Sequence, residues 1–194
     1  MQPWLVVGLG NPGPTYALHR HNVGYRVVEE LAHRMGVRFR VARGIRAEVA
    51  EGRIGPLGDN AGRLILAKSR TFMNETGWAV TRLLGYYKLQ PAQMIVVHDE
   101  LDIDPGQLRV KFGGGDNGHN GLRSMRASLG SGDFYRVRVG IGRPPGRQSP
   151  ADFVLSDYSS AERKVLGFQV DRAADAVESL LADGLEATQG RYNS

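Results

Sequence analysis

Trp4-Leu-Val-Val-Gly-Leu9, followed at once by Gly10-Asn-Pro-Gly-Pro14, is the stretch that decides the fold class. A short apolar run that ends in a cluster of glycine and proline predicts a buried strand leading into a loop. Beyond the loop, apolar residues recur at helical spacing from Val23 to Met35, and Gly36 is placed to end that helix. The chain is therefore expected to open with a strand, a loop and a helix.

Strand-like and helix-like segments alternate along the rest of the chain. Residues 55–62 carry turn chemistry, and the glycine-rich loop 113–121 should open a helix. A capping box, Ser159 to Glu162, starts a C-terminal helix at 159–184. The alternation predicts a single α/β domain over 1–194, a three-layer α/β/α sandwich with a twisted mixed sheet. The other predicted strands lie at 38–42, 46–54, 63–67, 94–98, 107–112 and 135–141, and a further helix at about 75–88.

Composition limits both the class of protein and the kinds of functional site that the chain can hold. A length of 194 residues suits one domain, and 41% hydrophobic with 23% charged residues predicts a globular protein with its own core. Cysteine is absent, which excludes disulfides, thiolate nucleophiles and cysteine-ligated metals. Neither a signal peptide nor a membrane-length apolar run is found, so a cytoplasmic protein without membrane contacts is expected. The net charge of +5 modestly favours nucleic acid as a partner.

The loop after the first strand matches a dinucleotide-binding fingerprint. Gly8-Leu-Gly-Asn-Pro-Gly13 has the form G-x-G-x-x-G. That fingerprint also requires an acidic residue about 20 positions on, at the end of a second strand. Glu29 and Glu30 have this distance but fall inside the predicted helix, and the prolines of the loop remove backbone donors that a pyrophosphate would need. A plain turn is favoured over a nicotinamide dinucleotide site, and a turn that presents Asn11 is favoured further.

A histidine and an aspartate carry the most informative pattern. Asp99 follows a buried strand, at the end where open α/β sheets place their ligand crevice, and His21 precedes the first helix. The chain has neither a G-x-S-x-G elbow nor a Walker A loop, so a His–Asp pair points to a histidine that activates water. The carboxylate would fix the imidazole tautomer, and the amides of Asn11, Asn74 and Asn120 would stabilise an oxyanion. These residues predict hydrolysis of an acyl bond without metal or cofactor.

Each candidate also has an ordinary structural interpretation. An isolated histidine is often a surface or core residue, and the aspartate could simply begin a solvated turn. Asn74 is equally suited to cap the helix that follows it, and Asn22 is assigned to capping. The pair Phe72-Met73 is typical of a core unless its loop faces a cleft. Lys111 and Arg138, predicted on different strands, could hold a phosphate or be solvated.

Six stretches, taken together, resemble bacterial peptidyl-tRNA hydrolases. They occur in that family's order and spacing over nearly the whole chain, which makes the set far more specific than any one of them. The stretches are Val7-Gly-Leu-Gly-Asn-Pro-Gly13 with Tyr16, Arg20-His-Asn-Val-Gly24, Thr71-Phe-Met-Asn74, His98-Asp-Glu-Leu-Asp102, Gly113-Gly-Gly-Asp-Asn-Gly-His-Asn-Gly-Leu122 and Tyr135-Arg-Val-Arg-Val-Gly-Ile-Gly142.

The resemblance implies an enzyme that cleaves the ester between a peptide, or an N-blocked aminoacyl group, and the 3′-terminal ribose of tRNA, so that tRNA from interrupted translation is reused. It implies His21 as the general base, Asp99 as the carboxylate that orients it, and Asn11 as a residue that positions water and peptide. It also implies a monomer that binds peptidyl-tRNA and needs no metal or cofactor. The remaining implied contacts are Tyr16, Phe72, Asn74 and Asn120 around the tRNA 3′ end and the peptide, Met73 and His119 beside them, and Lys111 with Arg138 as a clamp for the tRNA 5′ phosphate.

The resemblance further implies a lid at about 142–157, because this Pro/Gly-containing segment would lie near the cleft and its composition fits mobility. His19 departs from the family, which commonly has threonine there, and the tail stops soon after Tyr192. A catalytically silent RNA-binding relative is the alternative from another functional class. The intact histidine, aspartate and asparagines argue against it.

Overall fold

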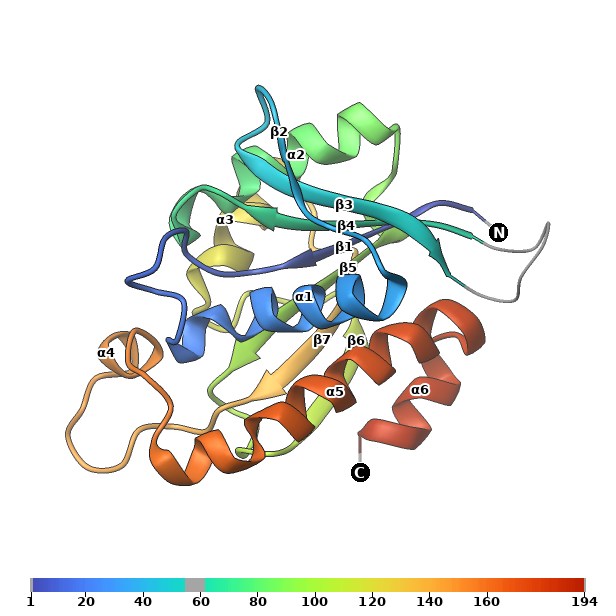
Figure 1. Ribbon diagram of the computed structural model, residues 1–194. Coiled ribbons are helices and arrows are strands. Elements are labelled where there is room, and N and C mark those ends of the chain that lie inside the picture. Colours follow the sequence, from blue (N-terminus) through green and yellow to red (C-terminus); the bar gives the residue numbers. More distant parts are fainter. Residues whose placement is uncertain (1, 55–61, 194) are drawn as a thin grey trace.

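A central seven-stranded sheet runs through the computed structural model, which describes residues 2–54 and 62–193 (Figure 1). The strand order is β2-β3-β4-β1-β5-β7-β6. The four strands from β4 to β7 in this order are parallel, whereas β2, β3 and β6 pair antiparallel, so the predicted mixed sheet is confirmed. The strands are β1 (Trp4–Gly8), β2 (Arg40–Ala42), β3 (Ala47–Ile54), β4 (Gly62–Ser69), β5 (Met94–Glu100), β6 (Leu108–Phe112) and β7 (Tyr135–Gly140).

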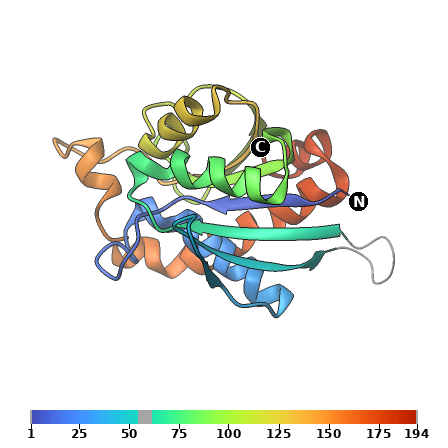
Figure 2. The same ribbon diagram turned by 90° about the horizontal axis from the view of Figure 1, so that it is seen from above.

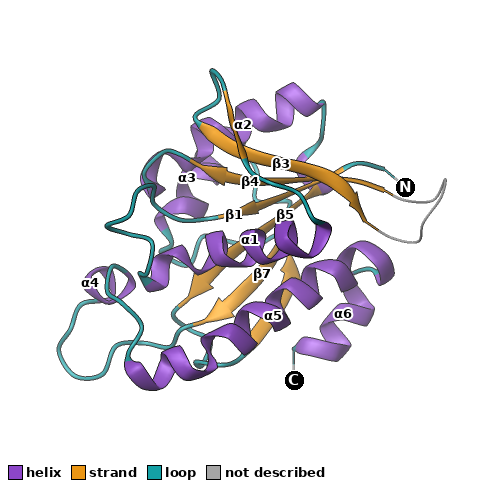
Figure 3. Ribbon diagram, in the orientation of Figure 1, coloured by secondary structure: helices purple, strands orange, loops and turns teal. Residues whose placement is uncertain are grey.

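Helices cover both faces of this sheet, which confirms the three-layer sandwich (Figures 2 and 3). One core packs α1 (Val23–Met35) and α5 (Ser160–Asp183) against the sheet. The other core packs α2 (Thr76–Tyr87) and α3 (Asn120–Leu129) on the opposite face. The short elements are α4 (Pro150–Val154), α6 (Leu185–Tyr192) and the 3-10 turns η1 (Arg20–Asn22), η2 (Met73–Glu75) and η3 (Pro91–Gln93).

The first strand shows why the sequence selects a sheet with two covered faces. Successive residues of a strand point to opposite faces, and Val6 lies in the α1/α5 core while Leu5 and Val7 lie in the α2/α3 core. All three side chains are buried. A continuous apolar run is therefore what a strand in the middle of such a sandwich requires.

Several predicted details are confirmed and others are wrong. Gly36 ends α1 in the left-handed conformation, with φ 66°, and the capping box at Ser159 is formed. Asp99 and Glu100 are the last residues of β5, whereas the sequence placed them just after it. The helices α4 and α6 were missed, because five residues are too few to show a helical period and α6 buries little beyond Thr188. The predicted turn over residues 55–62 falls mostly outside the described residues.

Two glycines allow the start of α1 to pack closely against the sheet. A Cβ at Gly24 would lie 2.3 Å from the Val97 carbonyl oxygen, and a Cβ at Gly8 would lie 2.2 Å from the Gly24 carbonyl oxygen. Both are closer than any side chain tolerates, so glycine is required at these two positions. The first glycine of the dinucleotide-like motif thus serves close packing of helix on strand. The same contact brings the turn that holds His21 against the end of β5.

No helix within residues 2–54 and 62–193 is both long and apolar enough to cross a bilayer.

Candidate active site

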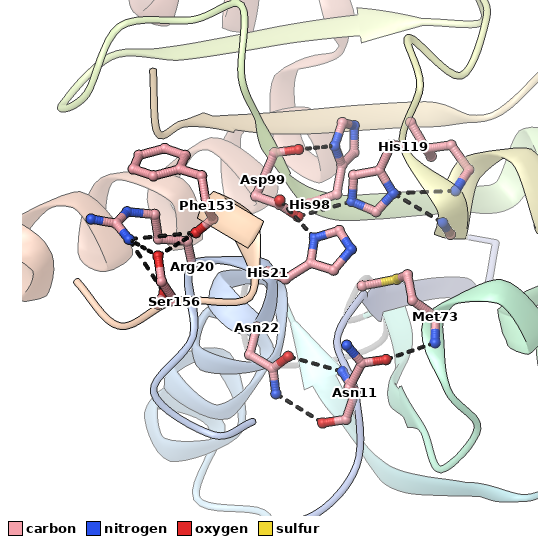
Figure 4. A network of polar contacts seen from close by, with 12 residues as sticks. Asn11, Arg20, His21, Asn22, Met73, His98, Asp99, His119, Phe153 and Ser156 are labelled. Atoms are coloured by element: carbon pink, nitrogen blue, oxygen red, sulfur yellow. Dashed lines mark hydrogen bonds and ion pairs between the residues drawn. The ribbon is translucent and has the colours of Figure 1, made fainter. Parts of the chain in front are cut away.

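Three polar side chains from distant parts of the chain meet at the carboxyl edge of the sheet (Figure 4). His21 comes from η1, Asp99 from β5, and His119 stands just before α3. His21 Nδ1 lies 2.7 Å from Asp99 Oδ2, and His119 Nε2 lies 2.8 Å from Asp99 Oδ1. All three side chains are buried. The structure thus brings together the predicted histidine and aspartate and adds a second histidine to the same carboxylate.

The hydrogen bonds of His119 fix the protons in this cluster. Its Nδ1 accepts from the backbone N–H groups of Gly121 and Leu122 at 3.1 and 3.4 Å, so the proton of the neutral ring is on Nε2. Asp99 therefore accepts from His119 Nε2–H on one oxygen and from His21 Nδ1–H on the other, since an ionised carboxylate only accepts. In neutral His21 this leaves Nε2 without a proton. That atom is the one able to act as a base.

Asp99 remains ionised in this setting. Burial alone would raise the pKa of Asp99, but the two imidazoles beside it hold that pKa well below its usual range. Because His119 donates to one oxygen of Asp99 through Nε2, the other oxygen faces His21 and can stabilise a cationic His21. The cluster can therefore accept a proton at His21 Nε2 without losing its hydrogen bonds.

His98 is a further buried histidine beside the cluster. Its Nδ1–H donates to the Asp99 backbone oxygen at 2.7 Å, and its ring lies 5.1 Å from that of His119. Burial lowers the pKa of His98 to about 3, so the ring is neutral at physiological pH. His98 lines neither of the two hollows that adjoin His21, so it supports the end of β5 from the protein interior.

His21, Asp99 and His119 also form a set of residues that could hold a metal ion, with ligand atoms within 4.8 Å of one another. Both ring nitrogens that face Asp99 carry a proton, and a cation between them would displace both. The arrangement therefore fits a hydrogen-bonded triad better than a metal centre.

A second group of contacts fixes the side chain of Asn11. Its backbone N–H donates to Asn22 Oδ1 and its carbonyl accepts from Asn22 Nδ2, both at 2.9 Å. Its own Oδ1 accepts from the Met73 N–H at 2.7 Å. Within the described chain Asn11 Nδ2 has no hydrogen-bond partner, so it is left to donate to a ligand. Asn22 occupies the N-cap position of α1, as predicted, but its side chain makes no cap bond to that helix and holds Asn11 instead.

Two hollows adjoin His21 and share Asn120, Ala151 and Val154, so they form one cleft with the histidine at its middle. The polar hollow, of about 310 Å³, also contains the acid–base cluster. The amide-aromatic hollow, of about 320 Å³, contains the residues predicted to surround the tRNA 3′ end and the peptide. The polar hollow adds Asp99, Glu100, Asn117, His119 and Arg123, and the amide-aromatic hollow adds Asn11, Tyr16, Phe72, Met73 and Asn74.

Comparison with known proteins decides the family. A family model described as peptidyl-tRNA hydrolase matches residues 5–194. The chain belongs to the peptidyl-tRNA hydrolase family. This confirms the family resemblance and the prediction of an enzyme of this class.

Relatives and solved structures agree with this membership. A peptidyl-tRNA hydrolase of Streptomyces coelicolor is 60% identical over 192 residues, covering 99% of this chain and 96% of that protein. One from Mycolicibacterium vanbaalenii is 55% identical and covers 100% of this chain and 98% of its own length. The crystal structure of peptidyl-tRNA hydrolase from Acinetobacter baumannii has a TM-score of 0.86 at 34% identity, over 98% of this chain and 94% of that one.

Lys111 and Arg138, the two basic residues that the family resemblance singles out, lie on β6 and β7 and line neither hollow. The antiparallel register pairs Lys111 with Arg136 and Arg109 with Arg138, so four cations project from one face. Burial and the charges of Arg138 and Arg136 lower the pKa of Lys111. This excess of positive charge is typical of an anion site beside the cleft.

Arg136 was not singled out by the sequence, yet it shapes this region. Its guanidinium is buried and donates to the carbonyl oxygens of Gly114, Gly115 and Gly132. It therefore holds the glycine-rich loop that leads to His119. A buried arginine cannot be distinguished from an exposed one by its position in an alternating strand.

Arg20 fastens the neighbouring segment to the turn that carries His21. Its guanidinium donates to Ser156 Oγ and Glu162 Oε1, both at 2.5 Å, and lies 4.0 Å from the Phe153 ring centroid. Burial would raise the pKa of Glu162, but this arginine holds it below its usual value. The residue before the histidine thus connects the cleft to α4 and α5.

The structure excludes the alternative role of Asn74 as a helix cap. Asn74 lies inside η2, its side chain makes no cap bond, and Glu75 is the N-cap residue of α2. The cap of α3 is provided by the side chain of His119, whereas Asn120 is the first residue of that helix. Asn74 and Asn120 are both exposed and face the cleft.

Proposed function

We propose that this enzyme hydrolyses the ester between the carboxyl end of a peptide, or of an N-blocked aminoacyl group, and the 3′-terminal ribose of tRNA. In this proposal His21 activates water and no metal takes part. The observation that carries the proposal is the orientation of the His21–Asp99–His119 cluster. The bonds to Asp99 leave His21 Nε2 without a proton, and His21 lines both hollows.

The reaction begins when His21 Nε2 takes a proton from a water molecule, whose oxygen attacks the ester carbonyl carbon. The carbonyl π electrons move to oxygen and give a tetrahedral oxyanion. As the oxyanion collapses, the bond to the ribose oxygen breaks, and the proton on His21 Nε2 passes to this leaving group. Asp99 keeps the imidazole oriented and stabilises its cation throughout.

Amide groups stabilise the oxyanion and bind the peptide. Asn11 Nδ2 is held in place by the bonds to its own Oδ1 and backbone, so it can donate without reorganisation. Asn74 and Asn120 offer further donors in the same hollow. Tyr16 and Phe72, whose ring centroids lie 5.8 Å apart, add an aromatic wall with Met73 beside it. This hollow suits a peptide, whereas the polar hollow suits the ribose of the last nucleotide.

The tRNA is placed by cations on the side of the polar hollow. Lys111 and Arg138 would bind the 5′ phosphate, because phosphate contacts position nucleic acid and provide affinity. His119 assists from within the cluster by holding Asp99. All these groups come from one chain, so we propose that the enzyme acts as a monomer. We also propose that it acts in the cytoplasm.

Residues 142–157 complete the cleft as a lid. Ala151 and Val154 of this segment line both hollows, and its two ends are held by Arg143 on Asp102 at 2.8 Å and by Arg20 on Ser156. The loop between these ends would move when tRNA enters. Limited proteolysis should show protection of this segment by tRNA, and equal cleavage with and without tRNA would contradict the lid.

The decisive experiment measures release of N-acetyl-aminoacyl groups from tRNA, with and without EDTA. The wild type should cleave this substrate, spare unblocked aminoacyl-tRNA, and be unaffected by EDTA. His21→Ala should lose nearly all turnover while tRNA binding stays close to normal. His33→Ala, which changes an exposed histidine of α1, is the matched control and should retain activity. Binding of tRNA without cleavage by the wild type would instead favour the silent RNA-binding alternative.

A further inference from the structure

A cluster of arginines around a tryptophan lies outside the cleft. Arg43 and Arg46 stand in the turn between β2 and β3, Arg70 follows β4, and Arg82 is on α2 (Figure 1). The guanidinium carbons of Arg82 and Arg46 lie 3.5 and 5.7 Å from the ring centroid of Trp78, which is 37% exposed. We call these five residues the Arg/Trp patch.

The charge of the Arg/Trp patch is uncompensated. All four arginines are exposed, and none forms an ion pair with any residue of 2–54 or 62–193. By contrast, two cations of the neighbouring strand β4 are paired: Arg63 with Glu51 at 2.8 Å and Lys68 with Glu29 at 3.1 Å. Four unpaired guanidinium groups predict a binding surface for carboxylates or phosphates.

The Arg/Trp patch is continuous with the peptide side of the cleft. Arg70 is two residues before Phe72, and its backbone N–H donates to the Arg46 carbonyl at 2.7 Å. A hollow of about 310 Å³ lies between Arg70 and the turn that holds Arg43 and Arg46. A second hollow of about 490 Å³ connects Arg70 to Asn11. Of the two glutamates that line it, Glu29 forms an ion pair with Lys68, whereas Glu48 forms none with a described residue. A chain that leaves the cleft past Phe72 therefore meets Arg70 first.

The order of strands determines which part of the substrate reaches this surface. The Arg/Trp patch lies at the β2–β3–β4 side of β1 and β5, whereas Lys111 and Arg138 lie on the β7–β6 side. This step rests on the proposed function, in which tRNA occupies the side of Lys111 and Arg138. The peptide then extends the other way, toward the arginines.

We infer that the Arg/Trp patch binds acidic residues of the peptide upstream of the ester, so that the enzyme prefers peptidyl-tRNA whose nascent chain is acidic near its C-terminus. The peptide is tethered at the ester, which gives its side chains a high local concentration at the patch. Exposed ion pairs are individually weak, so two acidic residues should raise kcat/KM about two- to tenfold.

The test compares N-acetyl-tetrapeptidyl-tRNAs that share a C-terminal residue and carry Asp-Asp, Asn-Asn or Lys-Lys at the two positions before it. N-acetyl-aminoacyl-tRNA with the same residue serves as the substrate too short to reach the patch. The wild type should rank the peptides Asp-Asp above Asn-Asn above Lys-Lys. The variant Arg43→Gln/Arg46→Gln/Arg70→Gln should lose this ranking and cleave the short substrate as the wild type does.

The control variant Arg163→Gln/Lys164→Gln/Arg172→Gln removes equal charge from α5, on the opposite face of the sheet from Trp78, and should keep the ranking. Circular dichroism and Tm verify that both variants fold. Equal kcat/KM for the three peptides would overturn the inference. An equal loss on all substrates in the first variant, with a weaker salt dependence, would overturn it in favour of RNA phosphates as the ligand. Failure of the wild type to cleave even the short substrate would overturn the proposed function itself.

Discussion

The acid–base cluster and the basic face of β6 and β7 are built in opposite ways. Asp99 is 2% exposed and both of its oxygens accept hydrogen bonds from histidines within the protein. Lys111 and Arg138 lie beside other cations and form no ion pair with any described residue. The first arrangement has its hydrogen bonds formed without a ligand, whereas the second carries positive charge that an anion would compensate. Changes in the cluster should therefore affect turnover, and changes in the basic face should affect binding.

The largest expected effect is that of Asp99→Asn. The new amide would donate to His21 Nδ1, which moves the imidazole proton to Nε2 and removes the base. We expect kcat to fall by about 10³–10⁴-fold with little change in tRNA affinity. Single-turnover kinetics and tRNA binding measure the two separately. Glu100→Gln, at the next position, is the matched control, and a loss of activity as large as that of Asp99→Asn would contradict the special role of Asp99.

A smaller effect should come from the amide wall. Asn11→Asp keeps the oxygen that accepts from Met73 but replaces the free donor by a negative charge. The oxyanion would then lose stabilisation, and kcat should fall by about 10²-fold. Asn193→Asp, at an asparagine that is bonded to β6 and lines neither hollow, controls for the added charge. If kcat of Asn11→Asp stayed within twofold of the wild type, the amide could not be an oxyanion donor.

On the basic face, Lys111→Ala should raise KM about tenfold and leave kcat nearly unchanged. One phosphate contact fewer should also reduce the slope of log affinity against log salt by about 1. Steady-state kinetics at several salt concentrations measure both quantities. Lys164→Ala on α5 is the control. A loss confined to kcat would exclude Lys111 from a phosphate clamp.

The same contrast separates what the sequence could and could not predict. The α/β alternation, the C-terminal cap of α1 and the capping box of α5 follow from local patterns of few residues, and all are confirmed. His21 and Asp99 were paired because strand ends gather at one edge of a sheet. The placement of His119, Asn22 and Arg136 depends on contacts between segments far apart in the chain. No local pattern distinguishes an asparagine that caps its own helix from one that clamps another loop.

The smallest effect on activity is expected for His98, which supports β5 from behind the cluster. Its pKa is lowered by burial to about 3, against an ordinary value of about 6.5. Between these two pH values only the unfolded chain binds a proton at this residue. Its contribution to stability is therefore complete above about pH 6.5 and is lost as the pH falls toward 3, at about 1.4 kcal/mol per pH unit.

His98→Asn keeps a donor for the Asp99 carbonyl and removes the titration. Urea unfolding from pH 4.5 to 7 should give a free energy of unfolding that falls less steeply with acid in this variant, by about one proton. His33→Asn, at an exposed site, should keep the wild-type slope. Turnover should stay within about twofold of wild type, because His98 lines none of the hollows. If the free energy of unfolding of His98→Asn kept the wild-type dependence on pH, His98 would be protonated in the folded protein. A loss of turnover as large as that of Asp99→Asn would place His98 among the groups that act on substrate.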